Sequence, residues 1–241
     1  MLDVEPNESG PVTLLLIISF LMGVFMATFT VASQTFFLEH YDEKTQLPLA
    51  LAVSGGFGII TTLIFNFFQG RISFSALAVV NLLIVVGLTA FIEFGDTYAA
   101  RQLEDDNLIY AFGFALVLPF TFVTQLVFWG AFNRMFNVRQ SKRIIGSVDL
   151  GTMIASIIGF FTIPFVLPYI EVKSLYTISL FAIIGYVILF VILSNRYLAK
   201  GKTVIQSEKD IKKLSVAAFL GNKYIVQMSI FIVASFVALR F

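Results

Sequence analysis

The amino-acid sequence predicts an all-α protein, a bundle of six transmembrane helices followed by the start of a seventh. Of its 241 residues, 58% are hydrophobic and only 13% are charged, which gives a mean hydropathy of +0.91. Ordinary soluble domains do not have this composition. The apolar residues also lie in long runs, and a helix needs about 20 such residues to cross a hydrocarbon core of about 30 Å. These runs are 12–38, 48–69, 73–95, 107–133, 144–170, 174–198 and 223–241.

Three segments follow from these runs. Residues 1–199 form the six-helix N-terminal bundle, 200–222 form a basic amphipathic linker, and 223–241 begin the seventh helix. In the linker, Ser207 and Asp210 have the spacing of a capping box that opens a helix lying on the membrane surface. Because the seventh run stops at Phe241, we expect a C-terminal half of the same protein to be the partner of this bundle.

The distribution of Lys and Arg predicts the orientation. The first, third and fifth links hold three basic residues, Lys44, Arg101 and Lys173, whereas the other links hold twelve when Arg196 and Lys223 at the adjoining ends of the runs are counted with them. Basic residues concentrate on the cytoplasmic side of membrane proteins. We therefore expect a multi-pass protein of the bacterial inner (plasma) membrane with a cytoplasmic N-terminus. The acidic start MLDVEPNESG lacks the basic region of a signal peptide, so the first helix should be retained.

Small residues recur every fourth position in three of the runs, which predicts faces where helices pack closely. These residues are Ser19, Gly23 and Ala27 in the first run, Ser54, Gly58, Thr62, Asn66 and Gly70 in the second, and Ser147, Gly151, Ala155 and Gly159 in the fifth. Asn66 differs from the others because an amide at mid-membrane depth needs a partner or a water-filled cavity.

The first and fourth runs share the pattern T-x-x-[ST]-Q-x-x-F, which starts at Thr30 in one and at Thr121 in the other. These runs cross the membrane in opposite directions, so the match is what a three-plus-three inverted repeat would leave. In that case Gln34 and Gln125 face a shared central cavity. A chance match is the alternative, because the chain holds 28 phenylalanines.

The fourth run also carries a polar stripe. Thr121, Gln125, Trp129 and Asn133 recur every four residues and lie on one helix face, which must contact protein or water rather than lipid. The stripe is either a set of interhelical hydrogen bonds or a substrate path. Pro119, just upstream, should free a backbone carbonyl and kink this helix.

The segment Phe128–Gly159 joins that stripe to the densest charge in the chain. It contains Arg134, Arg139, Lys142 and Arg143, and the following run opens with Asp149, which lies near a helix start where an acid is favourable. A basic loop that orients the protein explains the cations fully. The alternative is a funnel in which Arg and Lys bind phosphate.

Two family resemblances bear on this choice. The chain resembles the first half of a major facilitator superfamily transporter, because it has six helices, a basic link and the start of a seventh helix. Of that superfamily's signature between helices 2 and 3, the chain keeps only Gln69, Gly70 and Arg71. Trp129, Asn133, Lys142, Arg143 and Gly151 are similar to the helix 4 to helix 5 segment of the ATP/ADP translocase (nucleotide transporter) family. This resemblance implies nucleotide exchange, with Lys142 and Arg143 contacting phosphate.

Several other functions are disfavoured. The chain has no cysteine and one histidine, His40, so no His/Cys metal site or His-based catalytic triad is expected. From Tyr224 onward the seventh run has no lysine for a retinal Schiff base, and no P-loop is present. The small net charge, +1, gives no reason to expect nucleic acid as a partner. We expect neither an enzyme nor a cofactor.

Two hypotheses remain. The first is half of a secondary transporter that moves an anionic, phosphate-bearing metabolite such as a nucleotide across the bilayer by alternating access. The second is a membrane sensor or scaffold that keeps a transporter-like fold without transporting. For the first hypothesis, the candidate substrate-binding residues are Gln34, Asn66, Gln125, Trp129, Asn133, Arg139, Lys142, Arg143 and Asp149.

Overall fold

The computed structural model is all-α, and it describes residues 8–102, 107–198, 221, 223, 226–228 and 230–231. The chain divides after Gly201 into two compact units. In the second unit the few described residues are helical. Most of the predicted seventh run lies outside the described residues, and so does the predicted linker except for Gly221.

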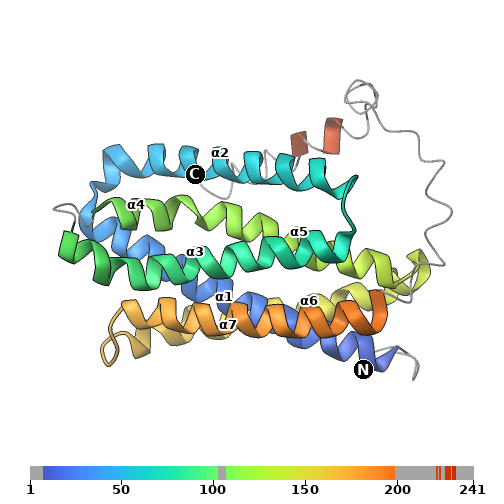
Figure 1. Ribbon diagram of the computed structural model, residues 1–241. Coiled ribbons are helices and arrows are strands. Elements are labelled where there is room, and N and C mark those ends of the chain that lie inside the picture. Colours follow the sequence, from blue (N-terminus) through green and yellow to red (C-terminus); the bar gives the residue numbers. More distant parts are fainter. Residues whose placement is uncertain are drawn as a thin grey trace. The chain divides into compact units, whose positions relative to one another are not determined.

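The described part of the first unit consists of seven α-helices and a short π-helix (Figure 1). Six spans are long and apolar enough to cross a membrane, which confirms the predicted polytopic membrane protein. The fourth of these spans comprises two helices, α4 and α5. The elements are α1 (Ser9–His40), α2 (Glu43–Gln69), α3 (Phe74–Gln102), α4 (Asn107–Ala115), α5 (Val117–Met135), α6 (Val138–Val166), α7 (Lys173–Leu193) and η1 (Ser194–Leu198).

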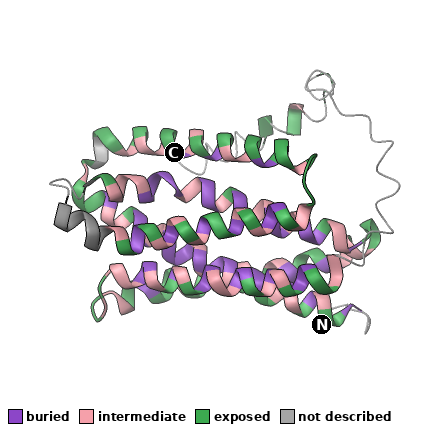
Figure 2. Ribbon diagram, viewed as in Figure 1, coloured by how far each residue is buried: buried purple, intermediate pink, exposed green. Residues whose placement is uncertain are grey.

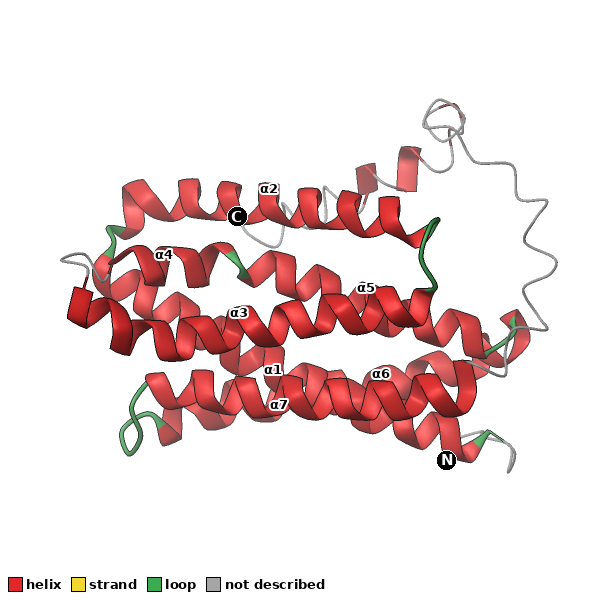
Figure 3. Cartoon of the chain, viewed as in Figure 1, coloured by secondary structure: helices red, strands yellow, loops and turns green. Residues whose placement is uncertain are grey.

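The break between α4 and α5 falls at Leu116, three residues before Pro119 (Figure 3). Proline has no N–H, and its ring clashes with the carbonyl four residues earlier, which here belongs to Ala115. The helix therefore stops at that residue and restarts at Val117. At the break, the Leu118 N–H donates a hydrogen bond to Ser54 Oγ of α2 (3.3 Å). The interruption expected from Pro119 is thus present.

The start of α6 differs from the prediction. A capping box starts the helix at Val138, because Asn137 Oδ1 accepts from the Gln140 N–H (3.0 Å) and Gln140 Oε1 accepts from the Asn137 N–H (3.1 Å). Arg139, Lys142 and Arg143 are therefore in the first turns of a helix. The segment expected to be a basic loop is reduced to the two residues between α5 and α6.

Helix α1 lies at the centre of the packing, mainly against α6 and α7, while α2 packs mainly against α5 (Figure 1). In their most apolar stretches, α1 is 56% buried and α2 only 11%. Figure 2 shows the same contrast, with buried positions frequent on the inner helices and exposed positions frequent along α2. The exposed apolar side chains of α2 suit contact with lipid tails.

The small-residue faces of α1 and α6 pack against each other. Ser19 Oγ donates to the Val148 carbonyl (2.7 Å), and Thr152 Oγ1 donates to the Ser19 carbonyl (3.1 Å). A Cβ atom added at Gly151 would lie 2.0 Å from Ser19 Oγ, and one added at Gly23 would lie 2.7 Å from Ala155 Cβ. The two helices can approach this closely only because both faces carry small residues.

Candidate functional site: a groove between α2 and α5

A groove of about 640 Å³ runs between α2 and α5, toward the end of the bundle that holds the α2–α3 link. Its apolar walls come from Ile59, Leu63 and Phe65 of α2 and from Phe122 and Leu126 of α5. Its polar lining comes from Thr62, Gln69, Gln125, Trp129, Asn133 and Arg134. Ligand sites commonly have this character, with mostly apolar walls and a few polar groups that fix orientation.

The groove begins where the close contact between the two helices ends. A Cβ atom at Gly58 would lie 2.7 Å from the Phe122 ring, so α2 and α5 touch at this level. One turn further along α2, Thr62 lines the groove, and its hydroxyl donates to the Gly58 carbonyl (2.8 Å). The small residues of α2 therefore pack against α5 at one end and leave space at the other.

Three members of the predicted polar stripe, Gln125, Trp129 and Asn133, lie together along this groove. Their side-chain N–H and carbonyl groups form no hydrogen bond with any residue that the structure describes. The Trp129 ring makes edge contacts with Phe128 and Phe132, at centroid distances of 5.2 and 5.5 Å. The stripe thus does not serve interhelical hydrogen bonding within the described part of the bundle, and its polar groups can bind a ligand or water.

Arg134 brings a positive charge to the same groove. Its guanidinium lies 3.9 Å from the centroid of the Phe74 ring at the start of α3, and Nη1 donates to the Gly130 carbonyl (2.9 Å). Stacking on an aromatic face attracts a cation and fixes the plane of its donors. An anionic group in the groove would meet this guanidinium next to the amide of Asn133.

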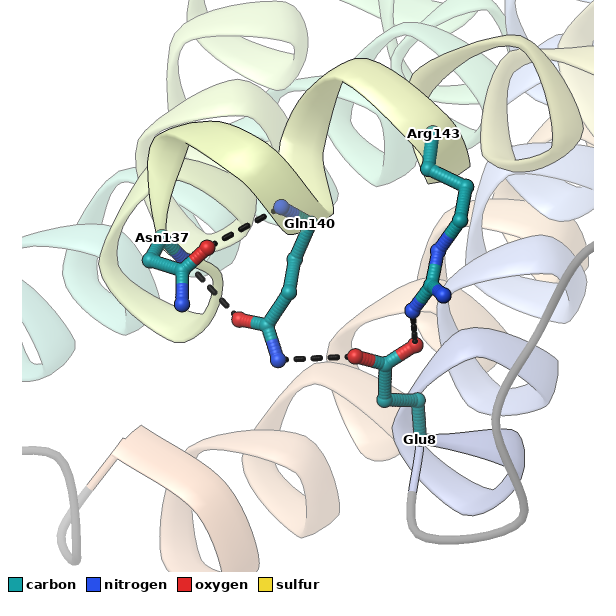
Figure 4. Close-up of polar contacts among 4 residues, drawn as sticks. All are labelled: Glu8, Asn137, Gln140 and Arg143. Atoms are coloured by element: carbon teal, nitrogen blue, oxygen red, sulfur yellow. Dashed lines mark hydrogen bonds and ion pairs between the residues drawn. The ribbon is translucent and has the colours of Figure 1, made fainter.

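The other predicted basic residues lie elsewhere. Arg143 forms an ion pair with Glu8, the residue that precedes α1, and Gln140 Nε2 donates to the same carboxylate (2.7 Å; Figure 4). Arg139 and Lys142 are exposed on the first turns of α6, and Asp149 is half-buried further along this helix. None of these four residues lines the groove.

Gln34 and Asn66 are also separate from the groove. Gln34 is exposed toward the end of α1, and Asn66 is exposed on α2 between the lining residues Thr62 and Gln69. The two glutamines of the repeated pattern therefore do not share one cavity among the described residues. The inverted repeat itself remains a prediction, because the helix arrangement does not show it.

Sequence reasoning missed three residues that the structure makes prominent. Gln69 completes the polar lining of the groove, Glu8 pairs with Arg143, and Glu93 is a carboxylate buried in α3. A signal existed for Glu93, since it is the only charged residue in the apolar run 73–95. No comparable signal existed for Gln69 or Glu8, because their partners are distant in the sequence.

Comparison of the chain with protein-family models, with curated proteins and with solved structures finds no match. The two family resemblances therefore remain predictions.

Proposed function

We propose that this polytopic membrane protein contributes one half of a secondary transporter, and that the groove between α2 and α5 binds an anionic, phosphate-bearing metabolite. The observation that carries the proposal is the line of Gln125, Trp129 and Asn133, which ends at Arg134 within a single groove. Polar side chains at membrane depth are costly, and they commonly mark substrate paths.

The proposed anion-binding residue is Arg134, in place of the Lys142 and Arg143 that the translocase resemblance implies. Arg143 is engaged by Glu8, and Lys142 is exposed on another part of the bundle. A guanidinium beside low-dielectric walls attracts anions more strongly than one surrounded by water, and its fork of donors suits phosphate oxygens. The neighbouring amides would orient the rest of the ligand.

Trp129 supplies a direct measurement of binding because it is the only tryptophan in the chain. We would place the full chain in lipid nanodiscs, excite the indole selectively, and titrate ATP, ADP and inorganic phosphate separately at low and high salt. We expect saturable changes in fluorescence that weaken as salt rises. Arg134→Gln should weaken binding about tenfold or more, since a hydrogen bond to a charged group contributes about 1.5–3 kcal/mol. Arg134→Lys should have an intermediate effect.

Arg139→Gln is the matched control, because it removes one positive charge from an exposed position outside the groove. Equal weakening by Arg139→Gln and Arg134→Gln would indicate a general charge effect and contradict a site at Arg134. If none of the three probes changes the Trp129 signal, the non-transporting sensor or scaffold becomes the better account. Uptake of the bound probe by liposomes that contain the protein then separates transport from binding alone.

A further inference from the structure

Helix α3 carries a buried carboxylate at Glu93, away from the groove. The residue is 8% exposed and lies two positions before the end of the span Phe74–Gly95, in which it is the only charged residue. Acidic residues are rare inside membrane-spanning helices and usually have a role there, because hydrocarbon solvates charge poorly. Glu93 belongs neither to the groove between α2 and α5 nor to the ion pair of Glu8 and Arg143.

The two oxygens of Glu93 have different surroundings. Thr177 Oγ1 of α7 donates a hydrogen bond of 2.5 Å to Oε1, a length typical of a hydroxyl that binds a carboxylate. Oε2 is buried and accepts no hydrogen bond from the described residues. A buried carboxylate oxygen without a donor is costly, and a proton on this oxygen would remove the charge.

A small cavity adjoins this carboxylate. It has about 10 Å³ of internal space, and its polar lining consists of Glu93 with Tyr110 of α4 and with Lys173 and Tyr176 of α7. About 10–15 Å³ of such space holds one water molecule. The cavity is thus large enough for one water beside the carboxyl group, but hard cations such as Ca²⁺ require six or more oxygen ligands.

We propose that Glu93 is a proton-binding site, at which a proton reaches the buried carboxylate by way of the adjoining one-water cavity. The proton comes from a hydronium ion in the solution at this end of the bundle. An O–H bond of the hydronium ion breaks, a new O–H bond forms on the carboxylate, and water is released. The step is a proton transfer, with no oxidation or reduction. On deprotonation the proton returns to water. Thr177 donates its hydrogen bond to Oε1 in both the protonated and the ionised state, so Oε2 is the oxygen that gains and loses the proton.

The groups near Glu93 include other sites of titration. Helix α7 contributes Lys173 and Tyr176, and α4 contributes Tyr110, whereas α1 contributes only Phe36 to the cavity lining. His40 does not line the cavity, but its ring lies 4.4 Å from the Tyr110 ring, centroid to centroid. The imidazole of His40 is therefore the competing group for which the test controls.

The test is infrared difference spectroscopy of the full chain in lipid vesicles, recorded between acidic and alkaline buffer. We expect a C=O stretching band from a protonated carboxyl group in the wild type and in His40→Gln, and loss of this band in Glu93→Gln. The amide oxygen that Glu93→Gln introduces can still accept the hydrogen bond from Thr177, so we expect this variant to fold. Its melting temperature, compared with that of the wild type, checks this expectation. A band of equal size in Glu93→Gln would overturn the proposal, and so would a band that disappears only in His40→Gln.

Thr177→Val provides a second arm. It removes the hydroxyl that binds Oε1, and loss of this bond should shift the band to higher frequency without abolishing it. A band at unchanged frequency would contradict its assignment to Glu93. If the proton also drives transport, a role that rests on the proposed function, uptake in Glu93→Gln should no longer respond to a pH gradient. The infrared result needs no substrate, so a groove that binds nothing leaves this test intact.

Discussion

The Glu8 carboxylate and the Arg143 guanidinium form an ion pair of 2.5 Å that joins the residue before α1 to the second turn of α6 (Figure 4). The Glu8 side chain is 7% exposed and that of Arg143 is 26% exposed. Gln140 binds the other carboxylate oxygen with its amide N–H while its amide oxygen caps the helix. This network fixes the N-terminus of the bundle against α6.

Removing one partner of this ion pair should destabilise the bundle. Arg143→Gln removes a cation that contacts the Glu8 carboxylate, and we expect the free energy of unfolding to fall by about 2–4 kcal/mol, near the range for broken buried pairs. The measurement is thermal or denaturant unfolding in detergent. Lys142→Gln, at an exposed position on the same helix, is the control and should behave as wild type.

The double variant Glu8→Gln/Arg143→Gln should regain part of the loss, because both charges of the pair are then removed. Additive losses in the double variant would show that the two residues act independently.

Nucleotide binding measured with the same variants also tests the role that the translocase resemblance implies for Arg143. If Arg143→Gln abolished binding without affecting stability, a role in phosphate contact would replace the structural one.

The contact between α1 and α6 should fail when Gly151 gains a side chain. A Cβ atom there would lie 2.0 Å from Ser19 Oγ and 2.5 Å from the Leu16 carbonyl, so Gly151→Ala should cost about 1–3 kcal/mol, and Gly151→Leu more. Gly146→Ala on the same helix is the matched control, since a Cβ atom there meets nothing within 4 Å. Melting in detergent would be compared. Equal melting temperatures would mean that the helices do not pack this closely.

Gln125 and Gln34 should differ in their contribution to ligand binding. Gln125 lines the groove and Gln34 does not, so Gln125→Leu should weaken the Trp129 fluorescence response and Gln34→Leu should leave it unchanged. Neither amide has a hydrogen-bond partner among the described residues, so we expect changes in stability within about 0.5 kcal/mol. Similar losses of binding in both variants would instead favour the shared cavity of an inverted repeat.

The orientation can be tested by cysteine labelling, because the native chain has no cysteine. From the distribution of Lys and Arg, single cysteines at Glu43, Asp105 and Lys173 should react with an impermeant reagent added outside the cell. Cysteines at Arg71, Arg139 and Lys209 should react only after the membrane is opened. The opposite labelling pattern would invert the predicted topology.

The sequence alone determined the features that depend on local rules. The length of each apolar run predicts a membrane span, because the rise of a helix and the thickness of the hydrocarbon core are both fixed. Pro119 likewise predicts a kink, which the structure shows as the break between α4 and α5, although Pro48 and Pro164 lie inside the continuous helices α2 and α6. The four-residue spacing also placed Gln125, Trp129 and Asn133 on one helix face.

Only the tertiary structure decided which residues meet across helices. The small residues of α1 could have packed against any helix with a similar face, and Ser19 meets Gly151 because of how the whole bundle folds. Arg143 and Glu8 are 135 positions apart in the chain, so no local pattern could pair them. Likewise α2 supplies one wall of the groove, and Thr177 of α7 contacts the buried Glu93. These partners depend on non-local packing, which helical periodicity and composition do not specify.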